Sequence, residues 1–240
     1  MSKPIGPLFP YFGAKWRSAK HYPVPQYGSV VELFAGGGGY SLNYHERAIA
    51  LYDTSPHVAA AWKFLLDASV QPQRIHDLVS PVRSVEEIPD EAQALVGFWL
   101  NPGSAVPKRS ASSRANPDAA LYSAGSVWSP KTRDRLAVQV TKVCHWTFLC
   151  RDWREVSASL LDVAPCTVFV DPPYQAKGVY YTGRRWISED YRALADRCMA
   201  LKAVGHQVIV CERQGADWLP FEPLHTYHGS LADGIEVIWQ

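Results

Sequence analysis

The sequence has no charge excess of either sign. Its 24 lysines and arginines and 23 aspartates and glutamates leave a net charge of +1 over 240 residues. The overall charge therefore gives no evidence for a highly charged partner. Evidence for such a partner has to come from local clusters of charge. Apolar residues at 47% and aromatic residues at 12% can fill a core, which excludes a disordered or fibrous chain. The length fits one α/β domain with an insertion.

The sequence also lacks the spacings of a disulfide framework or a metal site. Its five cysteines are odd in number and form no C-x-x-C pair, and no two histidines stand four residues apart. We therefore expect reduced thiols and no metal. An N-terminal signal-peptide segment and a run long enough to cross a membrane are both missing. These absences predict a soluble, cytoplasmic protein without a membrane partner.

Short apolar segments rich in β-branched residues alternate with helical stretches along the chain. The alternation predicts an α/β fold with a mostly parallel sheet and helices on both faces, to which a closing hairpin would add an antiparallel edge strand. We expect Ser129 and Ser188 to cap two helices and Gly205 to end the second. The expected strands are residues 29–34, 47–52, 145–149, 166–170 and 206–211, with the hairpin at 224–228 and 235–239. The expected helices follow Pro56, Pro130, Asp152 and Ser188, and another is favoured at 91–100.

A run of four glycines, residues 36–39, directly follows the first expected strand. Glycines at this point let the backbone approach a ligand closely, and an acid about 20 residues further on can bind both hydroxyls of a ribose. Asp53 stands at that distance from Glu32, at the end of the second strand. The pattern predicts a nucleoside site. A dinucleotide is disfavoured, because Ser41 occupies the third glycine position of G-x-G-x-x-G.

A second motif, Asp171-Pro172-Pro173-Tyr174, follows the apolar strand expected at 166–170. The two prolines remove two backbone donors, which leaves the local carbonyls free to point into a site. A carboxylate and a carbonyl there can accept both hydrogens of a planar amine. That acceptance favours a pyramidal nitrogen whose lone pair can attack a methyl sulfonium. Tyr174 can stack on the base that carries the amine.

These motifs and their order resemble the alpha group of DNA amino-methyltransferases, the DNA adenine methylase type. The resemblance rests on residues 12–15 (F-G-A-K), 32–39, Asp53 and 171–174, and lesser matches lie at 150–153, 181–194 and 236–239. It covers most of the chain except roughly residues 70–140. It implies the Rossmann-like fold of S-adenosylmethionine-dependent methyltransferases, with residues 1–69 and 141–240 forming the catalytic domain and residues 70–140 an inserted target-recognition region.

The resemblance also implies the roles of individual residues. Asp171 would hold the target amine together with the Pro172 carbonyl, and Tyr174 would stack on a flipped adenine. Two departures are Ala14, where the group has a glycine, and Trp153, where phenylalanine is common. The insertion is short for the group, so no target sequence carries over. The implied S-adenosylmethionine site comprises Tyr11, Phe12, Lys15, Glu32, Phe34, Gly36, Gly38, Asp53, Asp152, Trp153 and Asp171, and the implied catalytic residues are Asp171, Pro172, Pro173 and Tyr174.

Positive charge is concentrated between Asn101 and Lys142, where seven basic residues stand against two acidic ones. A basic loop with glycine and serine suits contacts with phosphates, and its position matches the target-recognition region of the group. Basic and aromatic residues just after the tetrad could clamp the flipped nucleotide. We therefore expect double-stranded DNA as the partner, contacted by Lys108, Arg109, Arg114, Lys131, Arg133, Lys177, Tyr181, Arg184 and Arg185.

The sequence leaves several alternatives open. The same tetrad chemistry would methylate the exocyclic amine of cytosine or an adenine in RNA. A DNA-binding regulator could keep the fold without turnover, whereas a nucleotide-dependent oxidoreductase is disfavoured by the incomplete dinucleotide motif. Restriction–modification, phage self-protection and chromosome marking are all compatible with the sequence. So is a monomer, the state in which many members of the group act.

Overall fold

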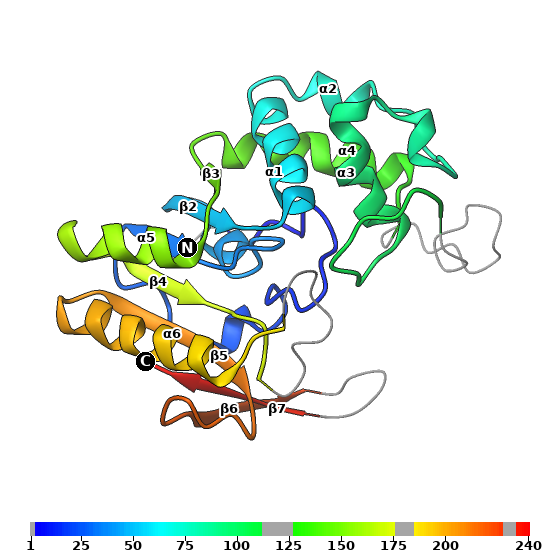
Figure 1. The fold of residues 1–240 in the computed structure, drawn as a ribbon. Coiled ribbons are helices and arrows are strands. Elements are labelled where there is room, and N and C mark those ends of the chain that lie inside the picture. The colour runs from blue at the N-terminus through cyan, green and yellow to red at the C-terminus, as the bar shows by residue number, and fades with distance from the viewer. Residues whose placement is uncertain (1–2, 112–126, 176–184, 228–233) are drawn as a thin grey trace.

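A computed structural model describes residues 3–111, 127–175, 185–227 and 234–240 of the chain. Within these ranges, seven strands form one sheet in the order β3-β2-β1-β4-β5-β7-β6 (Figure 1). Strands β1 to β5 run parallel to one another, which confirms the predicted α/β class. The strands are β1 Ser29–Glu32, β2 Ala48–Asp53, β3 Thr147–Cys150, β4 Thr167–Val170, β5 Gln207–Arg213, β6 Glu222–Tyr227 and β7 Gly234–Trp239.

The closing hairpin is present, but the position of its antiparallel strand in the sheet differs from the prediction. The second strand of the hairpin, β7, pairs antiparallel with β5 and with β6, so the antiparallel strand is internal and β6 forms the edge. Burial explains this order, because β7 carries the buried Val237 and Ile238, whereas Glu222 and Pro223 of β6 are exposed. Proline is tolerated on edge strands, where its missing N–H costs no ladder bond.

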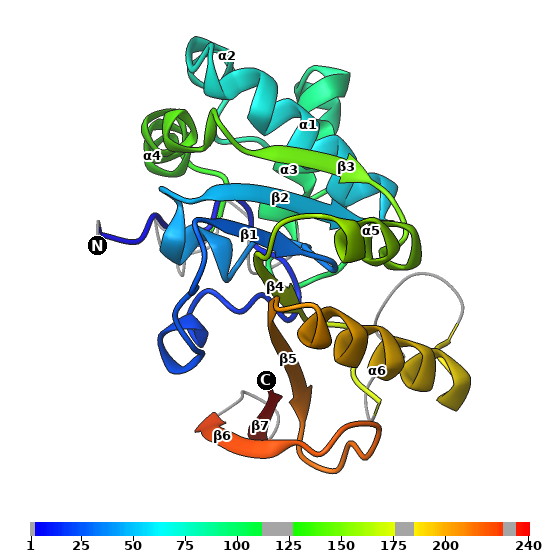
Figure 2. The ribbon, with the colours of Figure 1, turned by 90° about the vertical axis from the view of Figure 1, so that its left-hand side faces the viewer.

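Helices cover both faces of the sheet, as predicted. One hydrophobic core joins α5 and α6 to one face (Figure 2). A second core packs α1, α2, α3, α4 and the N-terminal segment on the other face. The described part of residues 70–140 therefore shares a core with α1, and the predicted division into a catalytic domain and an insertion stays a prediction. The helices are α1 Pro56–Ser69, α2 Gln73–His76, α3 Asp90–Leu100, α4 Pro130–Val140, α5 Trp153–Ser159 and α6 Ser188–Ala203.

The helix ends confirm most of the predicted signals. Ser129 caps α4 by accepting the N–H of Thr132 at 3.2 Å, and Gly205 follows α6 with a φ of +99°. The prediction that Ser188 caps α6 was wrong, because Ile187 is the cap residue and Ser188 is the first helical residue. The carboxylate of Asp190 accepts the N–H of Ile187 at 3.0 Å, which takes over the capping role.

The N-terminal segment packs closely against the glycine turn that follows β1. A Cβ atom added to Gly39 would lie 2.6 Å from the backbone nitrogen of Lys15 and 2.8 Å from that of Trp16. The amide of Asn43 ties the two segments together, donating to the carbonyls of Trp16 and Gly39 at 3.2 and 3.1 Å. Only glycine permits this approach, which brings Lys15 to the carboxyl end of the sheet.

Replacing Gly39 with alanine is expected to destabilise the fold, because the added methyl group would meet backbone atoms that cannot turn aside. Overpacking of this kind costs about 1–3 kcal/mol, and the melting temperature should fall by about 2–4 °C for each kcal/mol. Thermal unfolding followed by circular dichroism measures the change. The control is Gly28→Ala, where an added Cβ meets nothing within 4 Å. Equal melting temperatures for the two variants would contradict the close approach.

Candidate active site

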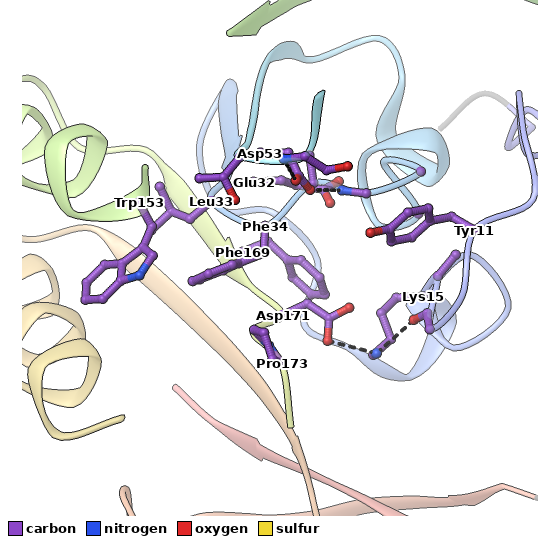
Figure 3. Close-up of a pocket in the computed structure, with 18 of the residues that line it drawn as sticks. Tyr11, Lys15, Glu32, Leu33, Phe34, Asp53, Trp153, Phe169, Asp171 and Pro173 are labelled. Atoms are coloured by element: carbon purple, nitrogen blue, oxygen red, sulfur yellow. Dashed lines mark hydrogen bonds and ion pairs between the residues drawn. The ribbon is translucent and has the colours of Figure 1, made fainter. Parts of the chain in front are cut away.

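A cavity of about 290 Å³ opens at the carboxyl ends of β1, β2 and β4 (Figure 3). Strands β1 and β4 are neighbours, and the chain continues from them to opposite sides of the sheet. Ligands of open α/β sheets bind at such a switch point. The lining residues are Tyr11, Phe12, Gly13, Ala14, Lys15, Glu32, Leu33, Phe34, Ala35, Gly36, Gly37, Gly39, Asp53, Thr54, Ser55, Pro56, Asp152, Trp153, Arg154, Phe169, Asp171, Pro173 and Trp186.

Asp53 links the glycine turn to the start of α1. Its carboxylate accepts the backbone N–H of Gly36 at 2.9 Å through one oxygen and that of Ser55 at 2.8 Å through the other. Burial raises the pKa of Asp53, and these backbone donors oppose the rise. Each carboxylate oxygen can accept a second hydrogen bond, so Asp53 can bind a hydroxyl of a ligand while it holds the turn in place.

Gly38 does not line the cavity, although the sequence predicted it there. A Cβ atom added to Gly38 would lie 2.9 Å from the ring of Trp62, and φ is +65° at this position. The indole N–H of Trp62 donates to the carbonyl of Gly36 at 2.8 Å. Gly38 therefore lets the turn pack on α1, and its contribution to the site is indirect.

Glu32 lies at the end of β1 and is almost fully buried beneath the turn. Its carboxylate accepts the backbone N–H of Ser41 at 2.7 Å. Burial raises the pKa of Glu32 to about 7, and the hydrogen bonds from Ser41 oppose the rise. Glu32 thus adds a buried acceptor to the wall of the cavity.

One end of the cavity is aromatic. The ring centroid of Phe34 lies 6.3 Å from that of Trp153 and 5.7 Å from that of Trp186. Trp153 is only 4% exposed, and its indole nitrogen has no hydrogen-bond partner among the described residues. Asp152 fixes the start of α5 by accepting the N–H of Arg154 at 2.8 Å. A flat ligand would suit this end, because aromatic rings pack well against flat groups.

Asp171 follows β4 and forms a largely buried ion pair with Lys15 (Figure 3). The Asp171 Oδ1 atom lies 2.8 Å from Lys15 Nζ, and the ammonium also donates to the carbonyl of Gly13 at 2.9 Å. Burial raises the pKa of Asp171 to about 6, although the ammonium of Lys15 opposes the rise. At neutral pH the carboxylate is therefore ionised and acts only as an acceptor.

The other tetrad residues are placed differently. Pro173 lines the cavity, and its carbonyl accepts the hydroxyl of Tyr191 at 3.0 Å. Pro172 is buried and Tyr174 half-buried, and neither is among the lining residues. The hydroxyl of Tyr174 donates to Glu236 at 2.6 Å, and Lys15 Nζ lies 4.7 Å from the centroid of its ring. Stacking of Tyr174 on a base stays a prediction.

The basic residues predicted to contact DNA do not line the cavity where the structure describes them. Lys108 and Lys131 are exposed, whereas Arg109 pairs with Glu86 at 2.8 Å and Arg133 with Asp134 at 3.0 Å. Arg185 is exposed beside the cavity residue Trp186. Arg114, Lys177, Tyr181 and Arg184 lie outside the described residues.

Sequence reasoning missed several lining residues. Trp186 and Phe169 carry no local motif, and only their aromatic character could have marked them. Arg154 follows the predicted Asp152 and Trp153 directly, so a wider reading of that segment would have included it. Among the described residues, no cluster of histidine, cysteine, aspartate or glutamate could hold a metal ion. No helix of the described ranges has the length and apolar character to cross a membrane.

No protein-family model and no curated protein matches the chain. Among solved structures, two of the rRNA methyltransferase aviRa from Streptomyces viridochromogenes match with a TM-score of 0.42, at 14% and 15% identity. Each match covers 97% of this chain and 87% of the other. The yhhF protein of Escherichia coli matches with a TM-score of 0.35 at 12% identity, over 88% of this chain and 74% of its own. These similarities are too weak to support an activity. The observed strand order itself confirms the predicted Rossmann-like fold.

Removing the ammonium of Lys15 is expected to raise the pKa of Asp171 above about 6, because the positive charge that offsets the effect of burial would be lost. Carbon-13 NMR of labelled aspartate carboxyls, recorded across pH on Lys15→Met, measures the shift, and Asp171→Asn identifies the resonance. The control is Lys63→Met, which removes an exposed lysine paired with Asp67 on α1. An unchanged pKa of Asp171 in Lys15→Met would contradict the ion pair.

Proposed function

We propose that the protein is an S-adenosylmethionine-dependent methyltransferase whose target is the exocyclic N6 amine of adenine in double-stranded DNA. One observation carries the proposal. The carboxylate of Asp171 faces the same cavity as the glycine turn, Asp53 and Trp153. An acceptor suited to an amine thus lies beside a site suited to a nucleoside.

The cavity residues fit the nucleoside part of S-adenosylmethionine. Asp53 would bind ribose hydroxyls, because an acid at the end of the second strand serves this purpose in nucleotide-binding sheets. Phe34 and Trp153, which line the cavity, would contact the adenine through their rings. When bound, this cofactor would supply a methyl group on a sulfonium, which is an electrophile with a good leaving group.

Asp171 would act on the amine that receives the methyl group. One oxygen is held by Lys15, and the second can accept an amine hydrogen. The backbone carbonyl of Pro172, which lies outside the cavity lining, would have to turn towards the amine to accept the other. Accepting both hydrogens favours a pyramidal nitrogen with its lone pair free for attack. The new N–C bond would form as the bond between the methyl carbon and sulfur breaks, and its electron pair would stay on sulfur as a neutral thioether. The extra proton of the nitrogen would then pass to the carboxylate of Asp171, so the site needs orientation and exclusion of water more than a strong base.

DNA as the substrate rests on the resemblance of the motifs and on the local excess of basic residues. A base inside a duplex cannot reach a cavity at the edge of a sheet, so the target adenine would have to flip out of the stack. The phosphates flanking it would contact basic side chains such as the exposed Lys108 and Lys131.

Asp171→Ala is expected to lower methyl transfer by at least about a hundredfold, because preorganised polar groups and correct positioning contribute at least this much. Affinity for S-adenosylmethionine should change little. The measurement is transfer of radiolabelled methyl groups to unmethylated genomic DNA, with total RNA in parallel and the products digested to nucleosides. The control is Asp162→Ala, which removes an exposed aspartate.

The labelled nucleoside decides the substrate. Label on adenine from DNA that disappears in Asp171→Ala would support the full proposal. Label on cytosine or in RNA would keep the chemistry and change the substrate. Cofactor binding without any label would favour a non-catalytic binding protein, and an Asp171→Ala enzyme that retains most of its rate would remove Asp171 from the mechanism.

Methyl transfer should also decline as the pH falls through about 6. Burial raises the pKa of Asp171 to about 6, and only the ionised carboxylate accepts amine hydrogens, so activity is present above this pKa and lost below it. The measurement is kcat/KM across the acidic and neutral range, with circular dichroism to show that the fold persists. A kcat/KM that stays constant down to pH values near the ordinary pKa of aspartate would contradict this assignment.

A further inference from the structure

Glu236 is a buried carboxylate on the closing strand β7. It begins the lesser match at residues 236–239, but the sequence assigned it no role in the site. It is 4% exposed, and it pairs across the sheet with Arg213 of β5 and His225 of β6. Side chains alternate along a strand, so Glu236 points to the same face as the buried Ile238. That face is covered by the N-terminal segment, including Tyr22.

Three side chains converge on one oxygen of Glu236. The hydroxyl of Tyr174 donates to Oε1 at 2.6 Å, and the hydroxyl of Tyr22 donates to the same oxygen. The ammonium of Lys15 lies 3.8 Å from it. Hydrogen bonds to a carboxylate are roughly twice as strong as those between neutral groups, so the two hydroxyls are held firmly.

Glu236 is thereby linked to both ends of the tetrad, directly at one end and through Lys15 at the other. Tyr174, the last residue of the tetrad, is bound directly. Asp171, the first residue, is reached through Lys15, whose ammonium lies between the two carboxylates. Glu236 itself does not line the cavity, so it acts on the site only through these neighbours.

Burying a carboxylate costs free energy that an apolar side chain at the same position would not. Ile238, which shares a face of β7 with Glu236, is apolar and buried, so an apolar side chain would also suit this face. A carboxylate without partners would therefore be unfavourable at this position. The carboxylate of Glu236 instead orients two hydroxyls and an ammonium, which gives it a specific role.

We propose that Glu236 is a positioning residue of the active site, which sets the orientation of Tyr174 and Lys15 and through them the place of Asp171. The inference rests on the proposed function, since its kinetic consequence requires methyl transfer. Its structural content, the link from Glu236 to Tyr174, can be tested without activity.

The test compares Glu236→Gln with Glu222→Gln. The first change keeps the size of the side chain and one oxygen but removes the charge. The second removes a charge from an exposed glutamate on the adjacent strand β6. In Glu236→Gln we expect kcat for methyl transfer to fall about tenfold or more, since small misplacements near the chemistry cost up to about a hundredfold. The Kd for S-adenosylmethionine should stay within about twofold, and Glu236→Asp, which keeps the charge, should recover part of the rate.

A spectroscopic readout accompanies the kinetics. Tyrosines labelled with carbon-13 at the ring carbon that bears the hydroxyl report the hydrogen bond of that hydroxyl. Tyr174→Phe and Tyr22→Phe identify the two resonances. We expect both to move in Glu236→Gln and neither to move in Glu222→Gln, and thermal unfolding confirms that each variant is folded.

Each outcome decides the inference. A lower kcat with unchanged Kd and shifted tyrosine resonances would support it. A folded Glu236→Gln enzyme as fast as Glu222→Gln would overturn it, and so would a parallel loss of kcat, cofactor affinity and melting temperature. If the wild-type protein methylates no nucleic acid, the proposed function fails separately. Tyrosine resonances that do not move would then overturn the positioning contact on their own.

Discussion

The candidate site depends on the ion pair between Lys15 and Asp171, which joins two segments far apart in the chain. Each side chain is mostly withdrawn from water, so neither charge would be favourable there without the other. The ammonium keeps a buried carboxylate ionised near neutral pH, and the carbonyl of Gly13 fixes the ammonium in turn. The close approach at Gly39 brings Lys15 within reach of Asp171, so the ion pair depends on the absence of a side chain at Gly39.

The parallel sheet supplies the other constraint. Because β1, β2 and β4 run in the same direction, their carboxyl ends meet at one edge, and Asp53 and Asp171 follow two of these strands. The carboxyl ends of β2 and β4 flank that of β1, so these two side chains reach the same cavity without any further interaction between them. The aromatic wall of Phe34, Trp153 and Trp186 then closes one end of the cavity where α5 and α6 pack on the sheet.

Much of this arrangement could be predicted, because its signals are local. The glycine run, the acid of Asp53 and the tetrad each stand at or just after the end of an apolar strand. Because these strands run in the same direction, the three features lie at the same edge of the sheet. The other features depend on interactions that no single motif specifies. The cap of α6 lies one residue earlier than predicted, because the carboxylate of Asp190 accepts the N–H of Ile187, and the position of β7 depends on which strand buries its apolar residues. Tyr174 turns towards Glu236, which lies 62 residues further along the chain.

The distance along the chain between Lys15, Tyr174 and Glu236 has a consequence for biosynthesis. Chains are made from the N-terminus at about 5–20 residues per second, and elements near the start can fold before the rest exists. The glycine turn and β2 can therefore form early, but the cluster around Glu236 assembles only after β7 has been synthesised and inserted beside β5. A nascent chain without β7 would already hold most of the cavity wall but would lack Glu236, so Tyr174 and Lys15 would gain this contact only after β7 has paired with β5.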